Sequence, residues 1–331
     1  MTWPEGQKES PDSVAAEIGA ESVEALPGRV DRYGKAKQRA LDVAEYMRAS
    51  ATGKDAATAN RVASCGEWLA FRHYFTADTV RLHAASFCMK HLLCPLCAIR
   101  RGARTLDAYL TRWEALRAGN PALRAYLVTL TVKNGEDLGE RFKHLHASQR
   151  ELWKRKQRGR GSALDGVAGA VWSYEFKRGS GSGLWHPHLH MIAVAESMTI
   201  EGQGNPGPIA AEWKAITGDS HMVDVRPIDQ ADPVSGFLEV FKYAVKVSDM
   251  EPADAVEAFR VLSGKRLIAS SGIFIGVPVP EALTDEPLDG LPFVELFFRW
   301  LRGGYTMHAQ SGRRAPEPGP KRSKFVKLMT S

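Results

Sequence analysis

Three histidines that alternate over five residues, His186, His188 and His190, have the clearest capacity for chemistry in this sequence. Residues 187–195 (PHLHMIAVA) are typical of a β-strand, in which alternate side chains lie on one face. We therefore expect His188 and His190 to point the same way, from backbone positions roughly 6.5–7 Å apart. Two imidazoles so placed can bind one metal ion. Surface histidines are the alternative, but three in five residues is a high density for a chain with ten.

The hairpin that precedes these histidines predicts a third ligand. Residues 169–177 (GAVWSYEFK) favour a strand, and the Gly-Ser run at 179–183 favours a hairpin loop. If this loop closes a symmetric hairpin, Glu175 lies opposite His188 and on the same face. Two imidazoles and a carboxylate with open coordination positions suit a divalent ion such as Mg²⁺ or Mn²⁺.

A tyrosine in a predicted helix at 234–246 is a candidate nucleophile. Glu239 and Tyr243 are four residues apart, so they share one face, and Lys246 follows one turn later. A phenol with a pKa near 10 is a poor nucleophile unless an ammonium group or a metal-polarised phosphate assists it. Glu239 is placed to act as a base, for example on a water molecule. Taken alone, this spacing also fits a core tyrosine beside a surface glutamate.

All four cysteines of the chain lie within one short segment, as Cys65, Cys88, Cys94 and Cys97. The last pair has the spacing of a zinc knuckle, and the two upstream thiols complete a Cys₄ set for a structural Zn²⁺. Clustered thiols in a chain without a secretory signal favour a metal over disulfides. The alternatives are reduced buried thiols, a redox-active pair, or a site in which His83 or His91 replaces one thiol.

The charge distribution favours a polyanionic partner. The net charge is +6 and the pI is near 9.1. The stretch 141–160, most of it in a predicted amphipathic helix at 137–157, has eight Lys or Arg and one acid, Glu151. A second basic cluster lies at 313–327. A solvated helix face and a solubilising tail are the simpler interpretations. Because no apolar run is long enough to span a bilayer, we expect a cytoplasmic protein without a membrane partner.

Composition and periodicity predict five segments. They are an N-terminal extension that is partly helical or disordered (1–60), a Cys-rich segment expected to bind zinc and to end in a helix (61–119), a compact α+β unit (120–250), a globular C-terminal extension (251–307) and a basic, disordered tail (308–331). The expected elements are strands at 124–133, 169–177, 187–195 and 221–225, and helices at 33–47, 95–116, 137–157, 209–216 and 234–246.

Taken in order, these motifs resemble the replication-initiator family of small rolling-circle plasmids, within the HUH endonuclease superfamily. That family has a cysteine-containing segment, a strand of the LTLT kind, a His-Pro-His-x-His strand and a Glu-x-x-Lys-Tyr-x-x-Lys helix. The matching residues here are 65–97, 127–131, 186–190 and 239–246, and Trp213, the strand at 223–226 and residues 264–266 are also similar to the family. The resemblance covers roughly residues 61 to 275.

The resemblance implies an α+β fold with a ferredoxin-like antiparallel sheet flanked by helices. It implies that His188 and His190 bind a metal, that Tyr243 is the single nucleophile and that Glu239 directs a terminating cleavage through water. The implied activity is metal-dependent, site- and strand-specific DNA nicking and joining through a 5′-phosphotyrosine intermediate. Lys246 is the candidate to assist Tyr243, although Lys242 is open as well.

The implied substrate is the double-strand origin of a supercoiled plasmid, nicked as a single strand, with a host helicase and a DNA polymerase as further partners. The residues expected to contact this DNA are Thr129, Thr131, His186, Lys154, Arg155, Lys156 and Arg158. For His186, a supporting role behind the metal ligands is open as well.

Other functions stay open at this point. A rolling-circle transposase or a relaxase would use the same chemistry, but in relaxases the tyrosine precedes the histidine strand, whereas Tyr243 follows His190 by 53 residues. A histidine-triad nucleotide hydrolase or transferase would use the middle histidine as nucleophile without a metal. A non-catalytic zinc DNA-binding protein would explain the cysteines and the charge but not the histidine strand.

Overall fold

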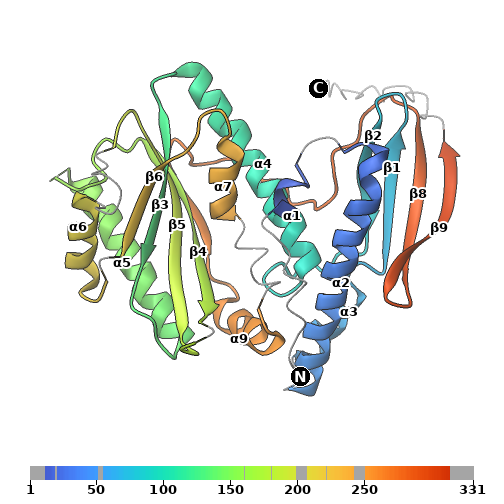
Figure 1. Cartoon of the computed structure of the whole chain (residues 1–331), viewed down its shortest axis with the longest axis horizontal. Helices are drawn as coiled ribbons and strands as arrows, with labels where there is room; N and C mark the ends of the chain where they lie inside the picture. Colours follow the sequence, from blue (N-terminus) through green and yellow to red (C-terminus); the bar gives the residue numbers. More distant parts are fainter. Residues whose placement is uncertain are drawn as a thin grey trace, which may run out of the picture. The chain divides into compact units, whose positions relative to one another are not determined.

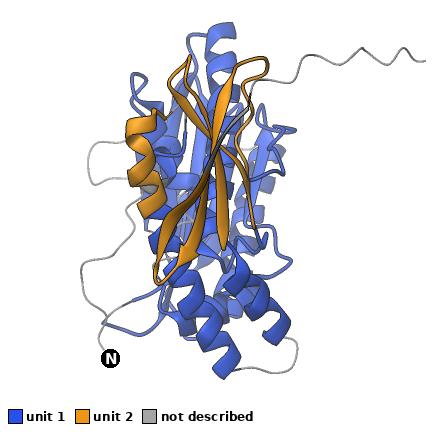
Figure 2. Cartoon of the chain, turned by 90° about the vertical axis from the view of Figure 1, so that its right-hand side faces the viewer, with its two compact units in different colours: residues 1–19, 32–66, 87–283 blue, residues 20–31, 67–86, 284–331 orange. Residues whose placement is uncertain are grey.

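The structure is a computed structural model in which residues 12–18, 21–50, 55–159, 161–179, 181–198, 207–220, 222–241 and 250–313 are described. The chain divides into two compact units, coloured separately in Figure 2. Unit 1 consists of residues 1–19, 32–66 and 87–283, and unit 2 of residues 20–31, 67–86 and 284–331. Each unit therefore collects segments that are distant in the sequence.

A five-stranded antiparallel sheet forms the centre of unit 1 (Figure 1). Its strand order is β6-β3-β5-β4-β7, in which β4 and β5 form the hairpin predicted around the Gly-Ser loop. The strands are β3 (Arg124–Thr131), β4 (Gly169–Arg178), β5 (Trp185–Ala195), β6 (Val223–Pro227) and β7 (Ile268–Gly272). The four strands expected from the sequence are present, and β7 is an additional edge strand that the sequence analysis missed.

One face of this sheet is apolar and lies under α5 (Leu138–Arg158). Trp153 of α5 packs against Trp172 of β4, and Phe142 contacts Tyr174 edge-to-face, with ring centroids 5.5 Å apart in both pairs. Helix α6 (Pro208–Thr217) lies beside α5 in Figure 1. The helix α5 begins where Asp137 accepts a hydrogen bond from the backbone of residue 140 and ends at a left-handed glycine.

The opposite face of the sheet lies under α7 (Pro233–Phe241), and α4 (Pro95–Gly119) packs on α7. Figure 1 shows α7 and α4 on the side of the sheet away from α5 and α6. Tyr109 of α4 stacks on Phe241, and Trp113 lies 6.1 Å from Phe237. Neighbouring residues of a strand point to opposite faces, so alternate residues of β4 and β5 face α7.

The remaining described helices of unit 1 are α1 (Asp12–Ala15), α2 (Leu26–Ala49, whose first residues belong to unit 2), α3 (Asp55–Ser64) and α9 (Pro252–Leu262). A buried ion pair joins α4 to the residues after α1, because Arg100 donates to Glu17 at 2.6 Å and neither side chain is exposed. Tyr33 of α2 donates to the same carboxylate. No described helix combines the length and the apolarity that crossing a membrane requires.

Unit 2 contains a four-stranded antiparallel sheet of order β2-β1-β8-β9, which was not expected from the sequence. Its strands are β1 (Trp68–Tyr74), β2 (Thr79–Ala85), β8 (Phe293–Leu301) and β9 (Gly304–Arg313). The expected Cys-rich segment at 61–119 thus contributes to both units, through β1 and β2 in unit 2. Strand β9 reaches Arg313, past the expected start of a disordered tail at His308, because its backbone pairs with β8.

The α+β class with antiparallel sheets flanked by helices is confirmed. The ferredoxin-like topology of the sheet in unit 1 stays a prediction.

The β4–β7 edge of this sheet requires glycine where the two strands approach most closely. Gly272 has φ of +57°, and a Cβ there would lie 2.1 Å from the carbonyl oxygen of Ala168. We expect Gly272→Ala to lower the free energy of unfolding by more than the roughly 1–3 kcal/mol that a left-handed residue costs alone. Urea unfolding measures this, with Gly276→Ala as control, because Gly276 also has positive φ but no atom within 4 Å of a Cβ. Equal losses in the two variants would show that the close approach is unimportant.

Candidate active site and metal centre

Polar side chains form two adjacent rows across the sheet of unit 1, on the face that α7 covers. The first row runs from β4 to the edge strand β6 and consists of Ser173, His190, Thr129 and Asp224, each paired with the next. The second row consists of Glu175, His188 and Thr131. Residues paired across antiparallel strands share a face, so the seven side chains belong to one surface. The pairing of Glu175 with His188 is the register that the hairpin argument predicted.

His190 is held between two partners. Its Nδ1 lies 3.1 Å from the hydroxyl of Thr129, and its Nε2 lies 2.9 Å from a carboxylate oxygen of Glu175. Glu175 is 2% exposed, and a carboxylate so buried requires a cation or hydrogen-bond donors. The threonine hydroxyl therefore fixes the ring so that Nε2 faces the carboxylate, as partners behind metal ligands commonly do.

His188 is oriented by the backbone instead. Its Nδ1 donates to the carbonyl of His186 at 3.0 Å, which leaves Nε2 as the nitrogen for other partners. Burial lowers the pKa of His188 below the ordinary histidine value, although the carboxylate of Glu175 opposes this shift. A lowered pKa favours the neutral imidazole, which is the form that binds metal ions.

The predicted metal ligands fit a divalent ion in type and partly in placement. The 2.9 Å between His190 Nε2 and Glu175 is the separation of adjacent ligands around an octahedral ion, which is about 3 Å for bonds of about 2.1 Å. The rings of His188 and His190 lie parallel with centroids 6.2 Å apart. These three ligand atoms do not converge within 4.8 Å of one another, and in the described part of the chain only the cysteine cluster does. His188 would have to turn to join the other two.

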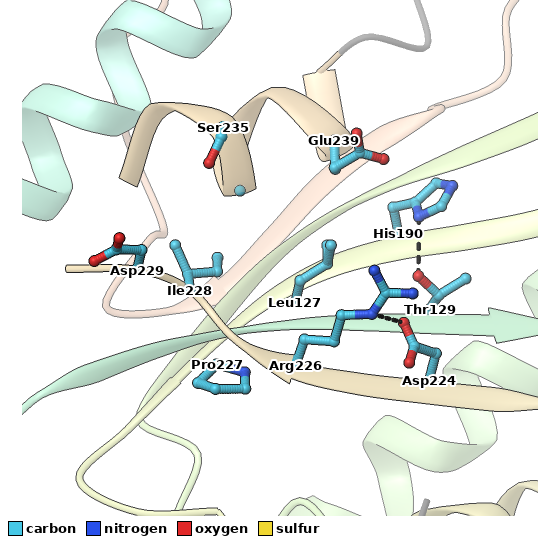
Figure 3. Close-up of a pocket in the computed structure, with 11 residues that line it drawn as sticks. Leu127, Thr129, His190, Asp224, Arg226, Pro227, Ile228, Asp229, Ser235 and Glu239 are labelled. Carbon is cyan, nitrogen blue, oxygen red and sulfur yellow. Dashed lines mark hydrogen bonds and ion pairs between the residues drawn. The ribbon is translucent and has the colours of Figure 1, made fainter. Parts of the chain in front are cut away.

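A pocket of about 590 Å³ opens beside His190, between strand β6 and helix α7 (Figure 3). His190 and Glu239 both line it, so the structure brings together one predicted metal ligand and the predicted base. Helix α7 is fixed over this pocket because the buried hydroxyl of Ser173 donates to the carbonyl of Val240. Gly236 allows the close approach, since a Cβ there would lie 2.7 Å from the Ile228 side chain.

Two of the predicted catalytic residues, Tyr243 and Lys246, lie outside the described residues, and so does Lys242. Helix α7 is described to Phe241, two residues before the tyrosine. Their roles stay predictions.

The residues predicted to contact DNA separate into two groups. In the first, Thr129 holds His190, Thr131 bonds to Ser220 and the Met222 carbonyl, and His186 lies 3.3 Å from Ser182. The second group consists of Lys154, Arg155, Lys156 and Arg158 on α5. Because α5 packs on the other face of the sheet, these basic residues do not belong to the pocket of His190 and Glu239.

Two pocket residues on the edge strand were not predicted from the sequence. Asp224 and Arg226 line the pocket and form an ion pair at 2.7 Å. Their alternation in the expected strand Val223–Arg226 was a usable signal, because it places both side chains on the histidine face once β6 pairs with β3.

The four cysteines form a buried cluster in unit 1. The Sγ atoms of Cys65, Cys88, Cys94 and Cys97 all lie within 4.8 Å of one another. Two of the separations, from Cys97 to Cys65 and to Cys88, are 3.6 Å. A disulfide needs about 2.05 Å, whereas the edge of a tetrahedron with Zn–S bonds of about 2.3 Å is about 3.8 Å. The group could therefore hold a metal ion, and His83 and His91 are not part of it.

Two cations lie behind the cysteine cluster. Lys37, which is 1% exposed, donates to the carbonyls of Ala63 and Cys65, and Arg61 donates to the carbonyl of Cys88. Such charges stabilise a cluster that becomes anionic when its thiols lose their protons.

The thiols share protons unequally. Hydrogen bonds within the cluster, that from Cys65 first, hold the pKa of Cys88 below its ordinary value and raise the pKa values of Cys94 and Cys97. Binding of a metal ion by all four sulfurs must therefore release protons.

Comparison with known proteins places the chain in a family. Residues 79–291, more than half of the chain, match Rep_1, the family described as "Replication protein". The "Protein rep" of Streptococcus pneumoniae serotype 2 (strain D39 / NCTC 7466) is 29% identical over 230 residues, covering 65% of this chain and 69% of the relative. The "Protein rep" of Lactiplantibacillus plantarum is 27% identical over 237 residues, covering 65% and 72%.

No solved structure matches the chain significantly. The family match and these relatives show that the chain belongs to the Rep_1 replication protein family, the family of plasmid replication initiators that its motifs resemble.

Proposed function

We propose that this protein initiates rolling-circle replication of a plasmid by nicking and rejoining one strand of its origin, with Tyr243 as the covalent nucleophile. The observation that carries the proposal is the pocket lined by both His190 and Glu239, because it joins the histidine strand to the helix that leads to Tyr243. The sheet of unit 1, with helices on both faces, supports the ferredoxin-like HUH domain proposed for residues 120–250.

In the nicking step, the phenolic oxygen of Tyr243 attacks phosphorus and the bond from phosphorus to the 3′ oxygen breaks. The phenol loses its proton to a base, and the departing oxygen gains one and leaves as a free 3′-OH. The new bond between tyrosine and the 5′ phosphate conserves the energy of the phosphodiester, so rejoining requires no nucleotide hydrolysis. At termination, Glu239 takes a proton from a water molecule that attacks phosphorus at the second cleavage, and the bond from phosphorus to the 3′ oxygen breaks. That oxygen gains a proton and leaves as a 3′-OH, which can then attack the phosphotyrosine and release the phenol of Tyr243.

A divalent ion, Mg²⁺ or Mn²⁺, would be held by His188, His190 and Glu175. When bound, such an ion supplies positive charge that stabilises the phosphate in the transition state. Thr129 and the carbonyl of His186 orient the two imidazoles, which supports this assignment.

The DNA enters as a single strand opened from a supercoiled plasmid, and the free 3′-OH primes a host polymerase while a helicase separates the strands. The basic residues of α5 contact phosphates of the flanking DNA on the other face of the sheet. The density of positive charge supports this assignment, because four of the five residues 154–158 are Lys or Arg and Glu151 is the one acid in the stretch 141–160.

Replacing Tyr243 with Phe removes the nucleophilic oxygen, so we expect loss of the covalent protein–DNA adduct with near-normal DNA binding. The assay incubates the protein with a supercoiled plasmid that carries its own gene and flanking DNA, with Mn²⁺ or with a chelator, and maps the DNA-linked peptide. Tyr46→Phe is the matched control, because Tyr46 is an exposed tyrosine on α2. A 5′ adduct formed by the Tyr243 variant would contradict the proposal.

Replacing Glu175 with Gln keeps the shape of the side chain but removes its charge. We expect Mn²⁺ to bind at least about tenfold more weakly, because mutating even the residues that orient metal ligands lowers metal affinity by that factor. Electron paramagnetic resonance of free Mn²⁺ measures the affinity without relying on nicking. Glu196→Gln, at an exposed carboxylate, is the control. Unchanged Mn²⁺ affinity in the Glu175 variant would exclude this carboxylate as a ligand, whatever happens to nicking.

We also propose that the cysteine cluster holds one structural Zn²⁺ per chain. Replacing Lys37 with Met keeps most of the side-chain volume but removes the charge behind Cys65. We expect zinc affinity to fall by about 10–100-fold, measured by competition with a chromogenic chelator. Lys214→Met, at an exposed lysine of α6, should leave the affinity unchanged. A purified protein with no zinc, and none taken up on addition, would refute the assignment.

A further inference from the structure

The pocket beside His190 extends well beyond the groups that the proposed chemistry uses. Figure 3 shows His190, Thr129 and Glu239 toward one end, and Asp229, Ile228 and Ser235 toward the other. At about 590 Å³ the pocket is of ordinary size for a small-molecule site, which spans roughly 300–1,000 Å³. A DNA strand whose scissile phosphate lay against His190 would therefore have a neighbouring nucleotide in the rest of this space.

The walls of the pocket match the two parts of a nucleotide. Leu127, Pro227 and Ile228 provide apolar surface suited to a base or a sugar. Among the described residues that line the pocket, Arg226 is the only lysine or arginine, while Asp224, Asp229 and Glu239 are acids. A phosphate entering between three carboxylates is repelled unless it lies against the one guanidinium, which can hold two of its oxygens at once.

Arg226 is placed to exchange its present partner, Asp224, for a phosphate. Its side chain is 71% exposed, and that of its partner Asp224 is 45% exposed, so the ion pair between them is solvated and contributes little. Both residues lie on β6, the edge strand of the sheet, and no strand among the described residues pairs with its outer side. A phosphate can therefore replace the carboxylate of Asp224 without exposing any buried group.

We propose that this pocket is a nucleotide subsite of single-stranded DNA, in which Arg226 moves from Asp224 to the phosphate of a nucleotide next to the cleavage site. In the absence of DNA, the carboxylate of Asp224 holds the guanidinium of Arg226, and it competes with an incoming phosphate. The choice of DNA as the ligand rests on the function proposed above, but binding in the pocket does not depend on cleavage.

The test measures DNA binding by the full-length protein without added Mg²⁺ or Mn²⁺, so that nicking does not affect the result and the proposed structural zinc is left in place. The probe is a short, fluorescently labelled single-stranded DNA of mixed sequence, because phosphate contacts do not depend on the base. Fluorescence anisotropy over a range of KCl concentrations gives the slope of the logarithm of the binding constant against the logarithm of salt. Each phosphate contact contributes about −0.7 to this slope for a single strand.

We expect Arg226→Gln to weaken binding several-fold and to reduce the magnitude of the salt slope by about 0.7. Asp224→Asn should tighten binding several-fold, and this gain should vanish when it is combined with Arg226→Gln. The matched control is Arg260→Gln. Arg260 lies on α9, outside the pocket, and the substitution breaks its ion pair with Asp55 of α3, which has a similar length. A slope for Arg226→Gln equal to that of the control overturns the subsite.

The two proposals fail separately in these experiments. A metal-dependent adduct on Tyr243 together with an unchanged salt slope in Arg226→Gln would leave the nicking function intact and remove the subsite. A changed slope without any adduct would leave a single-strand binding pocket and remove the nicking function.

Discussion

The register of the β4–β5 hairpin is the constraint on which the rest of unit 1 depends. It sorts the side chains of two adjacent strands into an aromatic face under α5 and a polar face under α7. A slip of one residue in β5 would turn His188 and His190 toward α5 and bring apolar residues beneath α7. Because Leu189 and Met191 of β5 are buried beside Tyr174 and Trp172 on the face under α5, the packing of the core also fixes the position of the site.

The second constraint is electrostatic, and it acts at both candidate metal sites. Each site collects groups that are costly to bury in their charged form, a carboxylate beside His190 in one and four cysteine sulfurs in the other. In each, the fold supplies partners at the back of the group, a threonine hydroxyl and a backbone carbonyl in the sheet, and two cationic side chains at the cysteines. A cation bound at the front of either group would stabilise the arrangement further.

Much of the candidate site in unit 1 could be predicted from the sequence, because its information is local. Alternation located the strands of the histidine hairpin, and the loop between them was short enough to give the pairing of Glu175 with His188. The spacing of Glu239 predicted its helix, but only the folded chain shows that this helix closes a pocket with His190. The parallel rings of His188 and His190 were not predictable, because strand geometry fixes the direction of a side chain and not its rotamer.

The sheet of unit 2 was missed for the opposite reason. Its strand β1 pairs with β8, more than two hundred residues later, so no local signal joins the two. The hairpin of β1 and β2 also lies between Cys65 and Cys88, where the metal motif drew the interpretation toward a single zinc segment. In the same way, the place of Arg226 in the pocket was not predicted, because its strand completes the histidine face only through pairing with β3.

Under the proposed function, the two faces of the unit 1 sheet also separate two tasks, cleavage and contact with the flanking DNA. The histidine pocket lies under α7, whereas the basic residues of α5 lie behind the sheet, with a layer of buried aromatic side chains between them. Under the proposed function, sequence changes among the exposed basic residues of α5 would leave the geometry of the histidine face unchanged. A lineage could then adapt to the DNA of a new replicon through one surface while it inherits its cleavage chemistry unchanged on the other.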